Sequence, residues 1–170
     1  CYAMKLAGTR LKHHESRRGL TIDTKAGPVW NGTVRLHEPA LLQPLSWKRP
    51  RVIFWNAHGD AFHPDVPDEW LFDMFAVIDR TPHHRHLVLT KRSARMREFM
   101  NNLTRLPSSI NGLYGLGSDA KLYQPIRNLW VGVSVEDQST ADQRIPDLLA
   151  TCGVGRFLSC EPLLGPIDLS

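Results

Sequence analysis

Arg51-Val52-Ile53-Phe54-Trp55-Asn56 is the stretch that decides the fold, because a short continuous apolar run is typical of a buried strand. Pro67 then opens a segment in which Trp70, Leu71, Met74, Phe75 and Ile78 recur at helical spacing. A buried strand followed by an amphipathic helix is the repeating unit of a parallel sheet. This pair therefore predicts an α/β fold, with the strand over 51–56 covered on both faces.

The same alternation extends along the whole chain. Upstream, the apolar spacing predicts a helix over 2–11, a short strand over 33–36 and a helix over 38–47. Downstream, it predicts strands over 86–90, 129–135 and 156–160, a helix over 93–103, and a helix capped by Thr140 and Gln143 that Pro146 should kink or shorten. One helix and then five strands separated by four helices imply a parallel sheet with right-handed crossovers.

Polar residues follow four of these strands where each one ends. They are Asn56 through Asp60, Thr90-Lys91-Arg92, Ser134-Val135-Glu136-Asp137 and Ser159-Cys160-Glu161. In an open doubly wound sheet, polar groups gather at one switch point, whereas a barrel repeats them at successive strand ends. Composition does not separate the two folds, and the spread of polar clusters favours the barrel.

Composition limits the classes of protein that fit. With 170 residues and 42% hydrophobic content the chain suffices for one domain, over 1–170. A net charge of +4 permits contact with phosphates without requiring it, and no aromatic-plus-basic stripe is evident in the sequence. Three scattered cysteines indicate a reducing, cytoplasmic setting, and no apolar run is long enough to span a membrane. The Gly-, Pro- and Ser-rich segment 106–125 predicts a long loop insertion.

Cys1-Tyr2-Ala3 begins the chain without an initiator methionine and directly before the first predicted helix. Taken alone, Cys1 is either an arbitrary starting point or the last member of a cysteine cluster. A wider set of motifs bears on this choice: Gly27-Pro28-Val29-Trp30-Asn31-Gly32, Gln43-Pro44-Leu45-x-Trp47-Lys48-x-Pro50-Arg51, Asp60-Ala61-Phe62-His63, Leu89-Thr90-Lys91-Arg92, Trp130-Val131-Gly132-Val133-Ser134-Val135-Glu136 and Ser159-Cys160-Glu161-Pro162-Leu163-Leu164-Gly165.

Together these motifs resemble a largely uncharacterised family of phages, prophages and bacteria, whose members look like radical S-adenosylmethionine (SAM) proteins. Its N-terminal three-cysteine motif ends in Cys-x-x-Cys-Tyr-Ala, so the resemblance makes Cys1 the third cysteine and both ends of the chain truncated. It implies a partial (β/α)6 TIM-like barrel of radical SAM type that lacks its first strand. It also implies a [4Fe–4S] cluster, SAM and an electron donor for the cluster.

The predicted site residues lie at the strand ends. On the radical SAM interpretation, Cys1 ligates the cluster, and the candidates for binding SAM or substrate are Asn56, Asp60, Thr90, Lys91, Arg92, Ser134, Glu136 and Glu161. Each also has a structural interpretation. Glu136 could belong to the acidic residues that precede a helix, and Lys91 and Arg92 could be the basic residues that begin a solvent-exposed helix. Cations are disfavoured at a helix start, which favours the functional interpretation of the basic pair.

The remaining histidines and cysteines are given structural roles. His58 and His63 flank Asp60, but loops that contain two histidines rarely bind metal. His83, His84 and His86 are predicted at the surface, and Cys152 and Cys160 are predicted as small buried groups.

The sequence thus predicts a radical SAM-like enzyme with an unknown substrate. The phage setting and the basic charge suggest nucleic acid or a nucleotide as that substrate. The alternative is a non-catalytic phage accessory or partner-binding protein.

Overall fold

The computed structural model describes residues 2–103, 126–153 and 155–170. Its helices and strands follow one another along the chain as α1 (Tyr2–Gly8), β1 (Thr21–Thr24), β2 (Gly27–Trp30), α2 (Glu38–Ser46), β3 (Val52–Trp55), α3 (Asp68–Arg80), β4 (Arg85–Thr90), α4 (Ser93–Asn102), β5 (Leu129–Ser134), α6 (Gln138–Ala150) and β6 (Gly155–Ser159). The helices predicted over 38–47, from Pro67 and over 93–103 are confirmed within a residue or two at their ends. The predicted loop over 106–125 lies outside the described residues.

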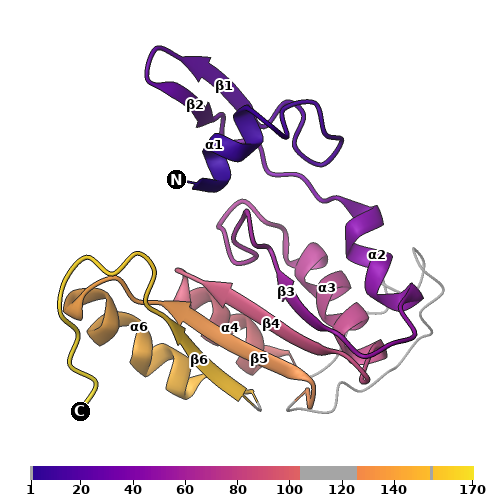
Figure 1. The fold of residues 1–170 in the computed structure, drawn as a ribbon. Helices are drawn as coiled ribbons and strands as arrows, with labels where there is room; N and C mark the ends of the chain where they lie inside the picture. Colours follow the sequence, from indigo (N-terminus) through magenta and orange to yellow (C-terminus); the bar gives the residue numbers. More distant parts are fainter. Residues whose placement is uncertain (1, 104–125, 154) are drawn as a thin grey trace.

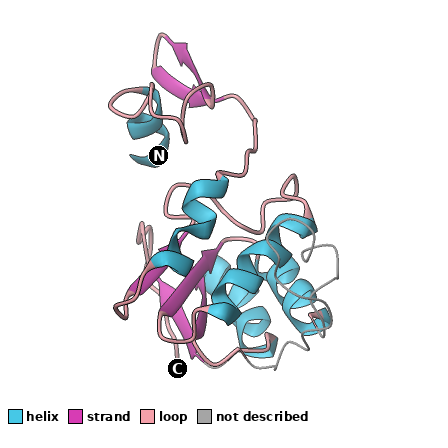
Figure 2. Ribbon diagram, turned by 90° about the vertical axis from the view of Figure 1, so that its right-hand side faces the viewer, coloured by secondary structure: helices cyan, strands magenta, loops and turns pink. Residues whose placement is uncertain are grey.

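A four-stranded parallel sheet organises the larger part of the chain, in the order β3-β4-β5-β6. Its register pairs Ile53 with His86, Val88 with Val131, and Val133 with Leu158. Because the strands follow chain order without a reversal, right-handed crossovers place their helices on the same face. Figure 2 shows α3, α4 and α6 together on one side of the sheet.

The core lies between this helix layer and the covered face of the sheet. The apolar stripe of α3 supplies Leu71, Phe75 and Ile78, all at most 1% exposed. Val88, Val131 and Val133 face them from the sheet and are fully buried. Phe99 of α4 contacts Phe62, Phe72 and Phe75 through their rings, which ties the β3–α3 loop to both helices.

The N-terminal segment forms a separate small unit, which Figure 1 shows beyond the upper end of the sheet. Strands β1 and β2 pair antiparallel, with Thr21 opposite Trp30. Helix α1 approaches β2 so closely that a Cβ at Gly8 would come within 2.0 Å of the Pro28 ring. The apolar spacing does not predict this hairpin, and the predicted strand over 33–36 is wrong because those residues form an extended connection.

The predicted barrel is also wrong. The chain is mixed α/β, with one four-stranded parallel sheet and one two-stranded antiparallel sheet, and no barrel closure is seen in the part the structure describes. Strands β3 and β6 are the two edges of an open sheet. The strand that was counted as the first of five, over 33–36, does not join it. Polar residues recur at the strand ends because the strands are parallel and neighbour one another in chain order. A barrel and an open sheet of this order share that arrangement, so the polar residues do not distinguish them.

The uncovered face of the sheet corrects a second prediction. Helices cover one face only, so β3 is not buried on both sides: Val52 is 65% exposed and Phe54 is 45% exposed. By the strand register, this open face consists of Val52, Phe54, Leu87, Leu89, Trp130 and Phe157. An apolar strand run alone did not reveal which of its faces is covered.

Helix α6 begins earlier than predicted. Asp137 is its N-cap, and Oδ1 of Asp137 accepts the backbone N–H of Thr140 at 2.8 Å. The Thr140 hydroxyl in turn accepts the backbone N–H of Asp137 at 3.0 Å, which completes a capping box. The predicted box from Thr140 to Gln143 is therefore displaced by one turn. The helix also continues through Pro146 to Ala150.

Candidate functional site

The carboxyl edge of the sheet is built around Asp60, which lies in the loop between β3 and α3. Its Oδ1 accepts the Thr90 hydroxyl at 2.7 Å, and its Oδ2 accepts Nη1 of Arg92 at 2.9 Å. The backbone N–H groups of Phe62 and Lys91 complete its partners, at 2.9 and 3.1 Å. This carboxylate thus fixes the end of β4 against the β3–α3 loop.

Glu136 is the second anchor of this edge and follows β5. Its Oε1 accepts the ammonium of Lys91, and its Oε2 accepts Nη1 of Arg144 at 2.8 Å. Burial by itself raises the pKa of Glu136, but the hydrogen bonds and charges of Lys91 and Arg144 outweigh it and hold the pKa below its usual range. Glu136 is therefore a permanent carboxylate at neutral pH and a poor general base.

These six side chains form one group, here called the edge network: Asp60, Thr90, Lys91, Arg92, Glu136 and Arg144. Three cations face two carboxylates, which leaves one positive charge in excess. Arg144 is 14% exposed, whereas Lys91 is 48% and Arg92 is 39% exposed. The buried members hold the geometry, and the two half-exposed cations remain accessible. The arrangement is suited to binding an anionic group such as a carboxylate or a phosphate.

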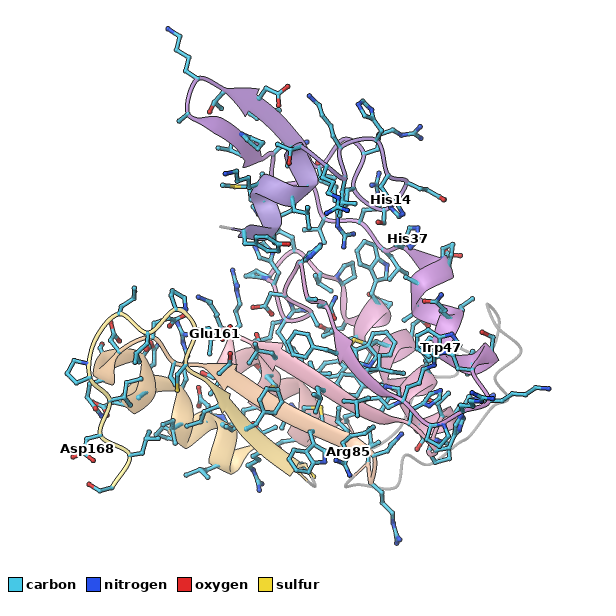
Figure 3. All side chains as sticks on the ribbon, viewed as in Figure 1. His14, His37, Trp47, Arg85, Glu161 and Asp168 are labelled. Atoms are coloured by element: carbon cyan, nitrogen blue, oxygen red, sulfur yellow. The ribbon has the colours of Figure 1, made fainter. Side chains whose placement is uncertain are left out.

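The other predicted binding residues lie around this network with different roles. Asn56 adopts a left-handed backbone (φ 55°), and its carbonyl accepts the N–H of Gly59 at 2.9 Å, which turns the chain after β3. Ser134 is buried, and its backbone carbonyl accepts Nη1 of Arg144 at 2.7 Å. Glu161 is exposed and lies at the same edge of the sheet in Figure 3. Of the eight predicted residues, five belong to the edge network.

Two arginines of this region were not predicted from the sequence. Arg144 lies in α6 and reaches back to Glu136 and to the end of β5. Arg95 of α4 donates to the carbonyls of His63 and Val66 and to Asp68, so it holds the β3–α3 loop that carries Asp60. Helical position alone gives no signal for either contact, since both partners come from other elements.

The histidines differ from their prediction. His84 and His86 are 2% and 0% exposed, so their predicted place at the surface is wrong, and only His83 lies there. His84 accepts the N–H of Arg51 at 3.2 Å, and His86 pairs with Trp55 and Thr81. The alternation of β4 places His86 toward the helices, whereas His84 precedes the strand and lies against Pro44 and Trp47 at the end of α2. Their polar atoms are buried because partners are available there.

The described residues do not supply a cluster site. A [4Fe–4S] cluster needs three or more thiolate-type ligands held together. Within residues 2–103, 126–153 and 155–170, no three His, Cys, Asp or Glu side chains are grouped to hold a metal ion. Cys152 precedes β6 and Cys160 follows it, so the two lie at opposite ends of that strand, and the exposed Cys160 is not the buried group that was predicted. Cys1 lies outside the described residues.

Comparisons with known proteins show one relationship. A family model described as "Protein of unknown function (DUF5131)" matches residues 1–170. Neither a curated protein nor a solved structure matches the chain. In addition, none of the described helices is long and apolar enough to cross a membrane.

Proposed function

The chain belongs to the DUF5131 family, and we propose that it acts in a phage-associated, radical SAM-like enzyme whose edge network binds SAM. The sequence motifs around Cys1, Asp60, Lys91 and Glu136 support this proposal by their resemblance to radical SAM proteins. The edge network supports it by its chemistry.

The observation that carries the proposal is the pair of half-exposed cations at the carboxyl edge. The methionyl part of SAM bears a carboxylate and an ammonium group. Lys91 and Arg92 are positioned by Glu136 and Asp60 and keep accessible donors for a carboxylate. The exposed carboxylate of Glu161 lies at the same edge and suits the ammonium group. In an open α/β sheet, ligands bind outside the carboxyl ends of the strands, which is where these groups lie.

Together with a reduced cluster, bound SAM would supply radical chemistry, which is the reaction type that we propose for this protein. The chain's own residues would bind and orient SAM rather than move protons, since Glu136 stays ionised. Cys1 would be one of the three thiolates that hold the cluster, and the described residues do not offer the other two.

Binding of S-adenosylhomocysteine tests the edge network without any cluster. We expect equilibrium dialysis to show saturable binding, and Lys91→Gln and Arg92→Gln to weaken it about tenfold each, as the loss of a charge-assisted hydrogen bond implies. Arg97→Gln is the matched control, because Arg97 is 47% exposed and also ion-paired, but with Asp147. The proposal fails if the unaltered chain does not bind, or if Arg97→Gln weakens binding equally.

Iron uptake tests the cluster separately. The full-length protein should bind about four irons per chain after anaerobic reconstitution. Cys1→Ala should abolish this uptake, and Cys152→Ala should leave it unchanged. Absence of iron in the unaltered protein would reject the enzyme and support the alternative, a non-catalytic accessory or partner-binding protein. The exposed apolar side chains of the open face, such as Val52 and Phe54, are the observation that favours that alternative.

A further inference from the structure

The amino edge of the sheet carries a group of cations. Each lies at or just before the start of a strand, and together they are called the basic edge: Lys48, Arg49, Arg51, Arg85 and Arg127. All five are exposed. In the part of the chain that the structure describes, none of them is ion-paired with a carboxylate. Figure 3 shows Arg85 at the end of the sheet opposite Glu161.

This edge differs in kind from the carboxyl edge. Lys91, Arg92 and Arg144 are each ion-paired with Asp60 or Glu136. Exposed cations gathered at one end of the sheet raise the positive potential there, which attracts a polyanion. This charge suits a partner that carries several phosphates.

Aromatic rings continue from the basic edge across the open face. The Trp130 ring lies against Gly155, where a Cβ would come within 2.3 Å of it, and the Phe157 ring lies against Gly132, where a Cβ would come within 2.6 Å. The two glycines thus let these rings pack directly on the backbone of the neighbouring strand. Phe54 is 45% exposed on the same face.

Cations and rings are also joined directly. The guanidinium of Arg85 lies 5.4 Å from the centroid of the Trp130 ring, and that of Arg51 lies 4.4 Å from the centroid of Trp47. Guanidinium and aromatic planes both stack on nucleobases, and unpaired cations bind the phosphates between them. A single strand exposes its bases for such stacking, whereas a duplex does not.

From these contacts we propose that the basic edge and the open face bind single-stranded nucleic acid. The surface lies at the end of the sheet opposite the edge network, so this proposal is independent of SAM binding. No aromatic-plus-basic stripe is evident along the sequence, because the members of this surface come from two separate loops and four strands. The sheet register brings them together.

Fluorescence anisotropy with a labelled oligonucleotide of about 20 nucleotides tests the proposal across a salt series. The unaltered chain should bind. The triple variant Arg49→Ala, Arg85→Ala and Arg127→Ala should bind more weakly, and the slope of log affinity against log salt should fall by about two, at roughly 0.7 per lost phosphate contact. Lys5→Ala, Arg10→Ala and Lys25→Ala form the matched triple control, with the same loss of charge at exposed sites of the N-terminal unit.

Phe54 tests the stacking contribution. Phe54→Ala should weaken binding about fivefold or more without changing the salt slope, and Phe54→Trp should restore it. Thermal unfolding of each variant checks that the fold is retained. Equal losses in the two triple variants, or equal affinity for a duplex of the same length, would overturn the proposal. So would a chain that binds no oligonucleotide and instead dimerises, which would assign the open face to a second copy.

Discussion

Trp55 donates its indole N–H to Nδ1 of His86 at 2.8 Å, inside the layer between β3, β4 and α3. Because Nδ1 accepts, the neutral ring carries its proton on Nε2, which lies 2.9 Å from the hydroxyl of Thr81. His86 is fully buried. The pKa of His86 is lowered to about 4, mainly by burial; a hydrogen bond with Thr81 opposes this shift, and the neighbouring His84 and His83 add to it.

This depressed pKa predicts a loss of stability in mild acid. Unfolded His86 binds a proton near pH 6.5, whereas the folded ring resists it until about pH 4. The stabilising contribution is therefore complete above pH 6.5 and is lost as the pH falls toward 4. Between pH 7 and pH 5 the loss is about 2 kcal/mol in the free energy of unfolding.

Urea unfolding at both pH values measures this contribution. In His86→Leu the stability at pH 7 should fall, since Trp55 and Thr81 lose their partner, but the further fall to pH 5 should be smaller by about 2 kcal/mol. His13→Ala, at an exposed histidine, serves as the control and should keep the pH dependence of the unaltered chain. An undiminished pH dependence in His86→Leu would refute the prediction.

The two ion pairs of Glu136 should differ in strength. Arg144 is 14% exposed and Lys91 is 48% exposed, so water weakens the Lys91 pair more. Double-mutant cycles with Glu136→Gln, Arg144→Met and Lys91→Met should give coupling of about 2 kcal/mol for the Arg144 pair and under about 1 kcal/mol for the Lys91 pair. Coupling energies in the reverse order would show that exposure does not control these pairs.

Asp60 should contribute to stability through its four donors. Asp60→Asn replaces one carboxylate oxygen, which accepts a hydrogen bond from Thr90 or Arg92, with an NH2 group that can only donate. We therefore expect a loss of about 2 kcal/mol in the free energy of unfolding. Asp65→Asn is the control, because its exposed carboxylate lies 3.7 Å from a ring nitrogen of His63. A loss of the same size in both variants would argue against a special role for Asp60.

The glycines under the aromatic rings should not tolerate a methyl group. Gly132→Ala and Gly155→Ala place a Cβ within 2.6 and 2.3 Å of the rings of Phe157 and Trp130. Each change should lower the free energy of unfolding by about 1–3 kcal/mol, which thermal unfolding would show as a lower melting temperature. Gly59→Ala, where nothing lies within 4 Å, should be close to neutral.

A second substitution separates the ring clash from other effects. Gly132→Ala combined with Phe157→Leu should recover part of the loss, because the smaller side chain leaves room for the Cβ. If the pair is no more stable than the sum of its single changes predicts, the ring is not the cause.

The strand–helix alternation could be predicted because it depends on local patterns. The apolar stripe after Pro67 specifies α3, and the runs around Val88 and Val131 specify β4 and β5. Chain order then brings their carboxyl ends together, which is why Asp60, Thr90, Lys91 and Glu136 could be chosen as site residues. Arg144 could not, since a helix pattern does not show which distant carboxylate an arginine will reach.

The sequence by itself determined the elements of the parallel sheet and the polar residues that follow its strands, because hydrophobic period and turn chemistry act over a few neighbouring residues. Tertiary structure decided that the sheet stays open and that Phe54 and Trp130 face outward. It also decided that His86 is buried and that, among the residues the structure describes, the cations of the carboxyl edge are ion-paired whereas those of the basic edge are not. These features depend on contacts between residues far apart in the chain, and burial and charge pairing are set only when those contacts form.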